Sequence, residues 1–464
     1  MGSAVLAVAL GGCALTAAPS HDAVVAQALP KGTNIPSAWR APGAGAGAVA
    51  DDWLAALGDP TLVALVVEAL AHNLDLRQAA DRVSIAEQSV IVIGAQLEPH
   101  VGANVGGRTT RDDEHDSNSN VTVAYADVAW ELDVWGKLRA QHAAARAGYE
   151  ATALDYAYAR QSLAAAVAKS WYLTIETREL LALAEKSVGI YRELAQLVQL
   201  RRAAGKDSNL DVADTRAKLE AAMSQSEFAR QSYDEARRGL DVLLGRYPAA
   251  EIDAAAEFPA LSPSPSTGMP AELLERRPDI IAAEREVIGA FRQQEAAELA
   301  LRPDFSLSLV GGRVGDPVLT LLRLNPWFAS AALGTAVPIY EGGALRAEVK
   351  IATAQQAQAV AHYGSVTLKA FREVENAISN DQLLARRLPL DESQTQDRAE
   401  AVRIATVQYV AGRRDLLWVS NLQSNELASD ADLIKLRALQ HVNRIFLYLA
   451  LGGSFDAAPA AASR

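Results

Sequence analysis

The chain has 464 residues, a formal net charge of −12 and a hydrophobic content of 50%, with only 6% aromatic residues. The acidic balance argues against a nucleic-acid partner, because proteins that bind nucleic acids present a basic face to the phosphates. No uninterrupted apolar run of 18 or more residues occurs in the body of the chain, which excludes an ordinary transmembrane-helix protein.

Motifs of enzymes and metal sites are missing from the sequence. The seven histidines are scattered without metal-ligand spacing, and the chain has neither a Gly-x-Ser-x-Gly nucleophile elbow nor a phosphate-binding loop. We therefore predict that the protein is not an enzyme and binds no metal. Abundant alanine and other helix formers favour long packed helices instead.

The N-terminus carries a processing signal. Residues 4–10 are apolar and lead through Gly11 and Gly12 to Cys13, the only cysteine of the chain. This pattern resembles a bacterial lipoprotein signal, although the usual Lys/Arg n-region is absent. We expect residues 1–12 to be the signal segment and a covalent lipid such as palmitate to be attached to Cys13 in place of any cofactor. The alternative is an ordinary secretory signal with a buried free cysteine.

An extended lead segment and a first structural repeat follow. Residues 13–58 are rich in glycine and proline and read as an irregular segment. The first repeat covers residues 59–250. It begins with Asp59-Pro60-Thr61, which is typical of a helix start, and apolar residues continue at helical spacing to residue 97. Alternation of period two over 100–134 then predicts a β-hairpin, with a charged turn at 108–120.

A very long helix is predicted over 137–204. This run contains no proline, and its length at about 1.5 Å per residue is roughly 100 Å. Leu163, Val167, Trp171 and Ile175 are spaced four apart and indicate one apolar face. The run ends at Gly205, and a second helical run returns to Gly245. Helices of this length need lateral partners.

The whole pattern occurs twice, so a second repeat covers residues 251–453. Three glycines of the first repeat, at 136, 205 and 245, recur as Gly343, Gly412 and Gly452 at an offset of 207 residues. The upstream helix recurs over 277–303, and a second strand pair is predicted from 305 to 340 with a loop at 315–325. A shared offset over more than a hundred residues indicates internal duplication.

Three segments interrupt or end this pattern. Pro389 should kink or interrupt the second long helix. Residues 246–270 contain five prolines and link the two repeats. Residues 454–464 are predicted to be a disordered tail.

The two strand pairs raise the question of oligomerisation. Four strands cannot close a barrel alone, and an open sheet edge cannot lie in lipid. If the strands are in a membrane, the chain must therefore oligomerise. The alternative is a soluble α+β protein with two surface hairpins.

Together these motifs resemble the TolC-like outer-membrane channels of tripartite efflux pumps, in the lipoprotein branch that includes OprM and NodT-type proteins. The resemblance covers nearly all of the chain from about Trp53 to Gly453. Its most telling pieces are residues 129–136, 273–280 and 337–343, together with the signal at Cys13.

The resemblance implies a fold that is mainly α with a small β part. Its long-helix hairpins would form a trimeric periplasmic α-barrel, and four strands per chain would contribute to a twelve-stranded transmembrane β-barrel. It also implies a homotrimer that works with a periplasmic adaptor protein and an inner-membrane efflux transporter, and that conducts drugs and other small molecules passively to the exterior. The protein would be anchored by its lipid in the outer membrane and extend into the periplasm, and Ala14 favours that sorting.

The glycine turns at Gly205 and Gly412 would then form the periplasmic tip, which is closed at rest in this family. Asp207, Asp211 and Asp415 lie beside these turns, and carboxylates at a constriction favour cations. Arg413 and Arg414 could pair with these acids and latch the tip. The alternative is that these residues are helix caps and solvated turn residues.

Two other functions are compatible with parts of the sequence. The same type of channel could serve type I protein secretion, although the lipoprotein signal favours efflux. A lipidated periplasmic adaptor also carries a long helical hairpin, but it should have one hairpin rather than two.

Overall fold

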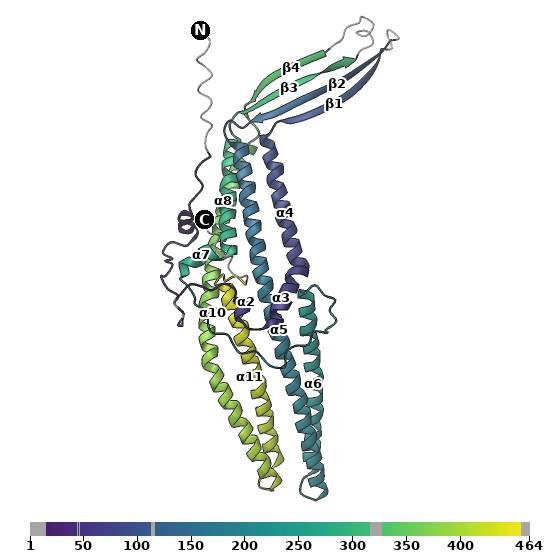
Figure 1. Ribbon diagram of the computed structural model, residues 1–464, viewed down its shortest axis with the longest axis vertical. Coiled ribbons are helices and arrows are strands. Elements are labelled where there is room, and N and C mark those ends of the chain that lie inside the picture. Colours follow the sequence, from purple (N-terminus) through teal and green to yellow (C-terminus); the bar gives the residue numbers. More distant parts are fainter. Residues whose placement is uncertain (1–14, 44, 46, 113–116, 316–326, 456–464) are drawn as a thin grey trace. The chain divides into compact units, whose positions relative to one another are not determined.

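The computed structural model describes residues 15–43, 45, 47–112, 117–315 and 327–455, so the predicted lipid site Cys13 and residues 456–464 of the predicted tail lie outside the described residues. The first two residues of that tail are ordered, because Ser454 N donates to Asp51 and Phe455 packs in the apolar core. The chain forms two compact units that interleave along the sequence (Figure 1). The first comprises Met1–Thr33, Asp81–Asp155 and Asp279–Val366, and the second comprises Asn34–Ala80, Tyr156–Pro278 and Thr367–Arg464. Among the described residues, no helix is both long and apolar enough to cross a membrane.

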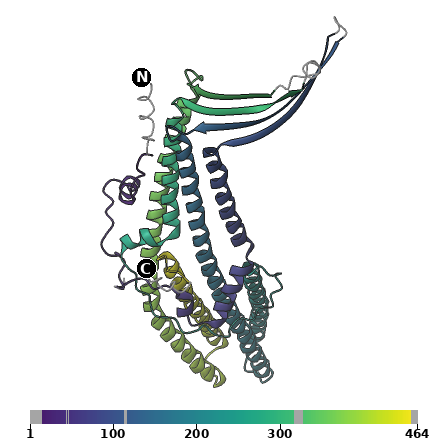
Figure 2. The ribbon, with the colours of Figure 1, turned by 45° about the horizontal axis from the view of Figure 1, so that its top comes forward.

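The first unit contains one four-stranded antiparallel sheet in the order β1-β2-β3-β4 (Figures 1 and 2). Its strands are β1 His100–Asp112, β2 Ser117–Leu132, β3 Asp304–Gly315 and β4 Trp327–Ala336. The two predicted hairpins are therefore confirmed, and β2 pairs with β3 from Leu132↔Phe305 to Thr122↔Gly315. This pairing joins the two repeats in a single sheet.

Two strand boundaries differ from the prediction. The charged turn was expected over 108–120, but strand pairing continues through Asp112 and resumes at Ser117, because a ladder is formed by backbone N–H and C=O groups, which polar residues also supply. The last strand was expected to reach residue 340 but ends at Ala336. Pro338 lies just beyond this end and has no N–H to donate to a ladder.

The junction between strands and helices in the first unit is held by two indole groups. Trp130 Nε1 donates to the Leu97 carbonyl at 2.9 Å, and Trp135 Nε1 donates to the Pro303 carbonyl at 2.8 Å. Leu97 lies three residues before β1, and Pro303 lies directly before β3. The two indole groups thus fix the base of the sheet to the segments that lead into both hairpins.

The helices of the second unit pack around an apolar core. This unit contains α2 Trp53–Ala56, α3 Pro60–His72, α6 Asn209–Leu243, α7 Leu273–Arg276 and α11 Leu416–Ala450. The stripe predicted along the first long helix lies in this core, with Val167, Trp171 and Ile175 at most 1% exposed. The first helix was predicted to run unbroken to residue 97, but α3 ends at His72. Asn73 separates it from the next helix by accepting from Leu76 N and donating to the Leu243 carbonyl.

The helices that cross the division between the units are α4 Leu74–Gly94, α5 Lys137–Ala203, α8 Pro278–Leu299 and α10 Ala344–Val410. The remaining short elements are α1 His21–Ala28, η1 Ala95–Leu97 and η2 Pro270–Glu272. Both long helices, α5 and α10, contain 67 residues. The matching glycines share a left-handed backbone, with φ of 71° at Gly205 and 73° at Gly412. The duplication predicted from the sequence is thus present in helix length and in turn geometry.

Pro389 lies inside α10 without ending it, so the predicted interruption is wrong. A proline there removes one hydrogen bond to the carbonyl four residues earlier and costs about 3 kcal/mol in an isolated helix. Two contacts with α11 flank the proline. Arg437 binds Glu392 at 3.0 Å, and Gln440 Nε2 donates to the Leu384 carbonyl at 3.3 Å.

Candidate gate at the two helical turns

The two turns that end α5 and α10 have the same hydrogen-bond pattern. Gly205 N donates to the Arg202 carbonyl and Lys206 N donates to the Arg201 carbonyl, both at 2.9 Å. At the second turn, Gly412 N and Arg413 N donate to the carbonyls of residues 409 and 408 in the same way. This is the Schellman arrangement, in which a left-handed residue satisfies the last carbonyls of a helix. Both turns are therefore defined by their backbone.

Two of the predicted gate acids cap the returning helices. Ser208 and Asp211 form a capping box at the start of α6, in which each side chain accepts from the other's backbone N–H. Asp415 accepts from Trp418 N at 2.9 Å at the start of α11. The bond to Ser208 holds the pKa of the Asp211 carboxyl below its usual value. These interactions match the helix-cap interpretation considered for both acids.

Asp207 has a different environment, because it joins the two turns. Tyr409 of α10 donates its hydroxyl to Asp207 Oδ2 at 2.5 Å. Arg201 Nε lies 3.0 Å from the same oxygen and 3.1 Å from Oδ1. Arg201 Nη1 also donates to the Val410 carbonyl at 3.2 Å. We call Arg201, Asp207 and Tyr409 the latch triad.

The latch triad is shielded from water. The side chains of Arg201 and Asp207 are 14% and 6% exposed, and the guanidinium of Arg201 lies 4.4 Å from the centre of the Tyr409 ring. Burial and the hydrogen bond to Asp207 raise the pKa of the Tyr409 phenol, and the bond to Asp207 raises the pKa of Arg201. The phenol therefore stays protonated and Arg201 stays charged at neutral pH, which gives a charge-assisted bond between the two helical hairpins.

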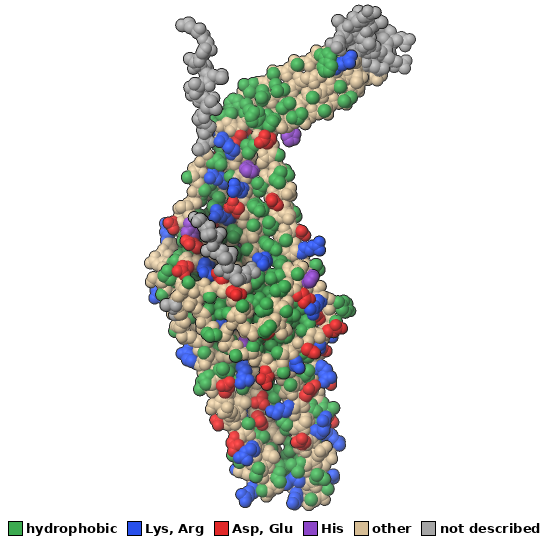
Figure 3. Space-filling view, in the orientation of Figure 1, with side chains coloured by type: hydrophobic (Ala, Val, Ile, Leu, Met, Phe, Trp, Pro, Cys, Tyr) green, Lys and Arg blue, Asp and Glu red, His purple; other side chains and the backbone are tan. Residues whose placement is uncertain are grey.

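The other predicted latch residues do not pair with these acids. Arg414 Nε lies 3.4 Å from Gln408 Oε1, and its guanidinium lies over the Trp418 ring at 4.6 Å. Arg413 is exposed and makes no recorded side-chain contact among the described residues. Blue side chains gather at the end of the helices where the turns lie (Figure 3). The acid that takes part in the latch is Asp207, and its cation is Arg201.

The sequence analysis missed Arg201 and Tyr409, although the duplication holds a signal for one of them. At the offset of 207 residues, Arg201 and Asp207 correspond to Gln408 and Arg414. In each repeat the two side chains contact each other across the turn. The contact is thus repeated with different chemistry, and only the first version is a buried ion pair. Tyr409 has no such signal, because its partner lies 202 residues away in the chain.

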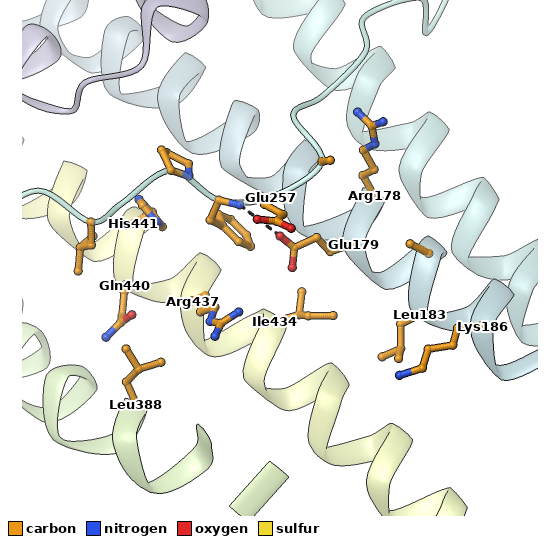
Figure 4. A pocket seen from close by; sticks show the side chains of 15 residues that line it. Arg178, Glu179, Leu183, Lys186, Glu257, Leu388, Ile434, Arg437, Gln440 and His441 are labelled. Atoms are coloured by element: carbon orange, nitrogen blue, oxygen red, sulfur yellow. Dashed lines mark hydrogen bonds between the residues drawn. The ribbon is translucent and has the colours of Figure 1, made fainter. Parts of the chain in front are cut away.

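A separate pocket of about 710 Å³ lies in the second unit beside residues 256–261 (Figure 4). Glu179 and Glu257 face each other at one side, and Glu179 accepts from Phe258 N at 3.2 Å. Arg437 and His441 reach it from α11. Among the described residues, no group of three or more His, Cys, Asp or Glu side chains is placed to hold a metal ion. The latch triad joins the ends of two helical hairpins, and we take it as the candidate site.

Comparison with known proteins identifies the family to which the fold belongs. The sequence model of a family described as "Outer membrane efflux protein" matches residues 65–246 and 269–453, well over half of the chain. The chain is 29% identical to the pyoverdine export outer membrane protein OpmQ of Pseudomonas aeruginosa, and the match covers 96% of this chain and 95% of OpmQ. It is 28% identical to the outer membrane protein OprJ of the same species, with 97% and 95% covered.

Solved structures are similar over almost the whole chain as well. The outer-membrane channel OprN superposes with a TM-score of 0.79 at 25% identity, covering 95% of this chain and 98% of OprN. A membrane protein from Pseudomonas aeruginosa gives a TM-score of 0.80 at 26% identity, covering 90% and 99%. The long paired helices and the small sheet are therefore shared with channel structures.

Proposed function

Because the chain belongs to the outer membrane efflux protein family, we propose that it is the gated exit channel of an efflux pump and that the latch triad holds its gate. Members of this family are outer-membrane efflux channels, which are not enzymes. They are trimeric and work with pump components. The cargo of this protein would be drugs or other small molecules that diffuse through the channel.

The finer assembly is part of the same proposal. Three chains would close their four-stranded sheets into one barrel of twelve strands, which would satisfy the edges that β1 and β4 leave open. A lipid on Cys13 would anchor each chain in the outer membrane. A periplasmic adaptor and an inner-membrane transporter would engage the end of the helices. A helix of 67 residues is about 100 Å long at 1.5 Å per residue, which suits a conduit across the periplasm.

The proposal of a gate rests on the latch triad. Asp207 belongs to the α5–α6 hairpin and Tyr409 to the α10–α11 hairpin, so their bond holds the ends of the two hairpins together. A hydrogen bond to a charged group is worth about 1.5–3 kcal/mol, and this one is shielded from water. Separation of the hairpins must break it. A partner that binds the separated state more tightly would shift the equilibrium towards opening.

The first test is the planar-bilayer conductance of the purified, lipidated protein. Tyr409→Phe removes only the hydroxyl of the latch, and Asp207→Asn removes the charge that both partners bind. We expect both variants to conduct more than the unmodified channel, because the loss of about 1.5–3 kcal/mol would raise the open population about tenfold or more.

Tyr233→Phe is the matched control. Its hydroxyl accepts from Ala254 N at 3.3 Å, so this variant loses one hydroxyl contact that does not join the two hairpins. Its conductance should remain near that of the unmodified channel. Unchanged conductance in Tyr409→Phe and Asp207→Asn would reject the latch. A purified trimer that never conducts would reject the channel.

A further inference from the structure

The sheet has two chemically different faces, which follow from its register. Side chains alternate between faces along a strand, and directly paired residues share a face. The face that contains Asp127 also carries, on the described strands, many residues that are polar or small: Asn104, Gly106, Tyr125, Ala129, Glu131, Ser306, Ser308, Gly312, Ser330 and Ala332. Its apolar members are Val121, Val123, Val310, Val314 and Phe328. We call this surface the polar face.

The opposite surface is mostly apolar, although it also carries Arg313, which pairs with Trp327. Paired positions place on it the side chains of Val101, Val105, Ala126, Val128, Trp130, Phe305, Leu307, Leu309, Trp327, Ala331 and Leu333. Trp327 and Leu333 are 68% and 71% exposed in the single chain. A sheet with an apolar face and a polar face is typical of a strand set whose outer side meets lipid and whose inner side meets water. The polar face is therefore the side that would line the conduit.

Asp127 is seated in the polar face by its neighbours. Its direct partner on β1 is Gly102, and a Cβ at that glycine would come within 2.9 Å of Asp127 Oδ1. Asn104, two residues further along β1, donates from Nδ2 to Asp127 Oδ1 at 2.7 Å. The absence of a side chain at Gly102 leaves room for the carboxylate to lean towards Asn104 along the strand.

No cation neutralises Asp127 among the described residues. The other two acids at the base of this face, Glu131 and Asp304, both bind Lys137, at 2.7 and 2.9 Å. Arg108 is on the same face but is paired with Val121, six residues from Asp127 and about 20 Å along the strands. Asp127 has a neutral amide as its recorded partner, and an ionisable residue in a membrane strand set is a candidate functional group.

We propose that Asp127, positioned by Asn104 and Gly102, is a charge filter that makes the outer-membrane section of the conduit favour cationic solutes over anionic ones. The proposal rests on the function proposed above, since it needs the polar faces of several chains around one lumen. Symmetry then places one Asp127 of each chain at the same depth. Rings of acidic side chains give cation preference in channels.

The expected effect is modest and depends on salt. The Debye length is about 10 Å at 0.1 M and 3 Å at 1 M. The electrostatic potential of carboxylates on the wall of a wide lumen therefore reaches solutes far from the wall only at low ionic strength. The filter would therefore bias which solutes pass without blocking the others.

The experiment measures reversal potentials in a KCl gradient for the full-length lipidated trimer in planar bilayers, with potassium and chloride as the probes. All variants are made both alone and with Tyr409→Phe, so that the closed turns do not dominate the selectivity. At about 0.1 M salt, Asp127→Asn should lower the potassium-to-chloride permeability ratio about twofold. Asn104→Asp, which adds a carboxylate on the same face, should raise it by a similar factor.

The exchanged variant Asp127→Asn with Asn104→Asp is the matched control. It keeps one carboxylate and one amide in the same pair and should restore a ratio near the original. At 1 M salt the differences should shrink. If Asp127→Asn and Asn104→Asp conduct normally and have the same permeability ratio as the unmodified channel, the charge filter is wrong. The proposed channel function would be unaffected by that result. No conductance in any variant or in the unmodified protein would reject the channel itself.

Discussion

At the scale of single residues, His441 shows how burial determines a proton equilibrium. Its ring stacks on Phe258 at 5.4 Å and lies 4.6 Å from the centre of Tyr172, and the residue is only 4% exposed. Burial, helped by the nearby charge of Arg444, lowers its pKa from 6.5 to about 4. The folded protein therefore keeps this imidazole neutral at pH values where the unfolded chain would protonate it.

This shift predicts a loss of stability in mild acid. Below pH 6.5 the unfolded state binds more protons than the folded state. The stabilising contribution of the neutral His441 ring is therefore fully present above pH 6.5 and is lost as the pH drops from 6.5 towards 4. At pH 5 the contribution of His441 is about 2 kcal/mol. Thermal unfolding of the detergent-solubilised protein at pH 7.5 and pH 5 measures it, and His441→Phe should lose less stability between the two pH values than the unmodified protein.

His72→Gln is the control for that comparison, because His72 is exposed and its ring contacts only the Glu68 carbonyl of its own helix. This variant should lose as much stability as the unmodified protein on acidification. An equal loss in His441→Phe would mean that other groups cause the acid sensitivity.

The two turns show which residue contacts could be predicted from the sequence and which could not. The caps at Asp211 and Asp415 follow from local sequence, because a cap needs only its own next turn. The contact of Asp207 with Tyr409 depends on how two hairpins pack, and the residues are 202 positions apart. Composition and spacing located both turns. They assigned the cation of the latch to the second turn, whereas Arg201 supplies it from the last turn of α5.

At the scale of elements, periodicity and duplication predicted the long helices and both hairpins. They failed where tertiary packing overrides local preference. Pro389 is the main example. A proline is expected to kink or end a helix, whereas α10 continues through it and contacts α11 on both sides of the proline. The end of β4 was misplaced because Val337 to Tyr340 keep a strand-like composition although the ladder stops at Ala336.

Replacement of this proline should therefore stabilise α10. Pro389→Ala restores one backbone N–H and removes the ring from a helix interior, which is worth up to about 3 kcal/mol. Hydrogen exchange of the amides at residues 386–393 should slow, and the unfolding temperature should rise. Pro60→Ala is the matched control, since Pro60 is in the first turn of α3, where no N–H partner is lost. Faster exchange in Pro389→Ala would show that α10 needs the proline.

At the scale of the whole molecule, the single chain leaves apolar helix surface uncovered. Ile85 and Val92 of α4 are 65% and 67% exposed, and their spacing of seven residues places them on one face of the helix. Exposed apolar residues on one face mark an interaction surface. In a family of trimers, a second copy of this chain is the partner that such a surface fits.

Charges on this face should therefore weaken assembly. Ile85→Lys combined with Val92→Lys would bury two unpaired cations at a contact between chains, at a cost of several kcal/mol, and native mass spectrometry of the detergent-solubilised protein should show monomers in place of trimers. Glu87→Lys, on the opposite side of the same helix, changes charge without touching this face and should leave the trimer intact. If the double variant stays trimeric, then α4 faces solvent or lumen in the assembly. The subunit contact would then have to lie on other helices.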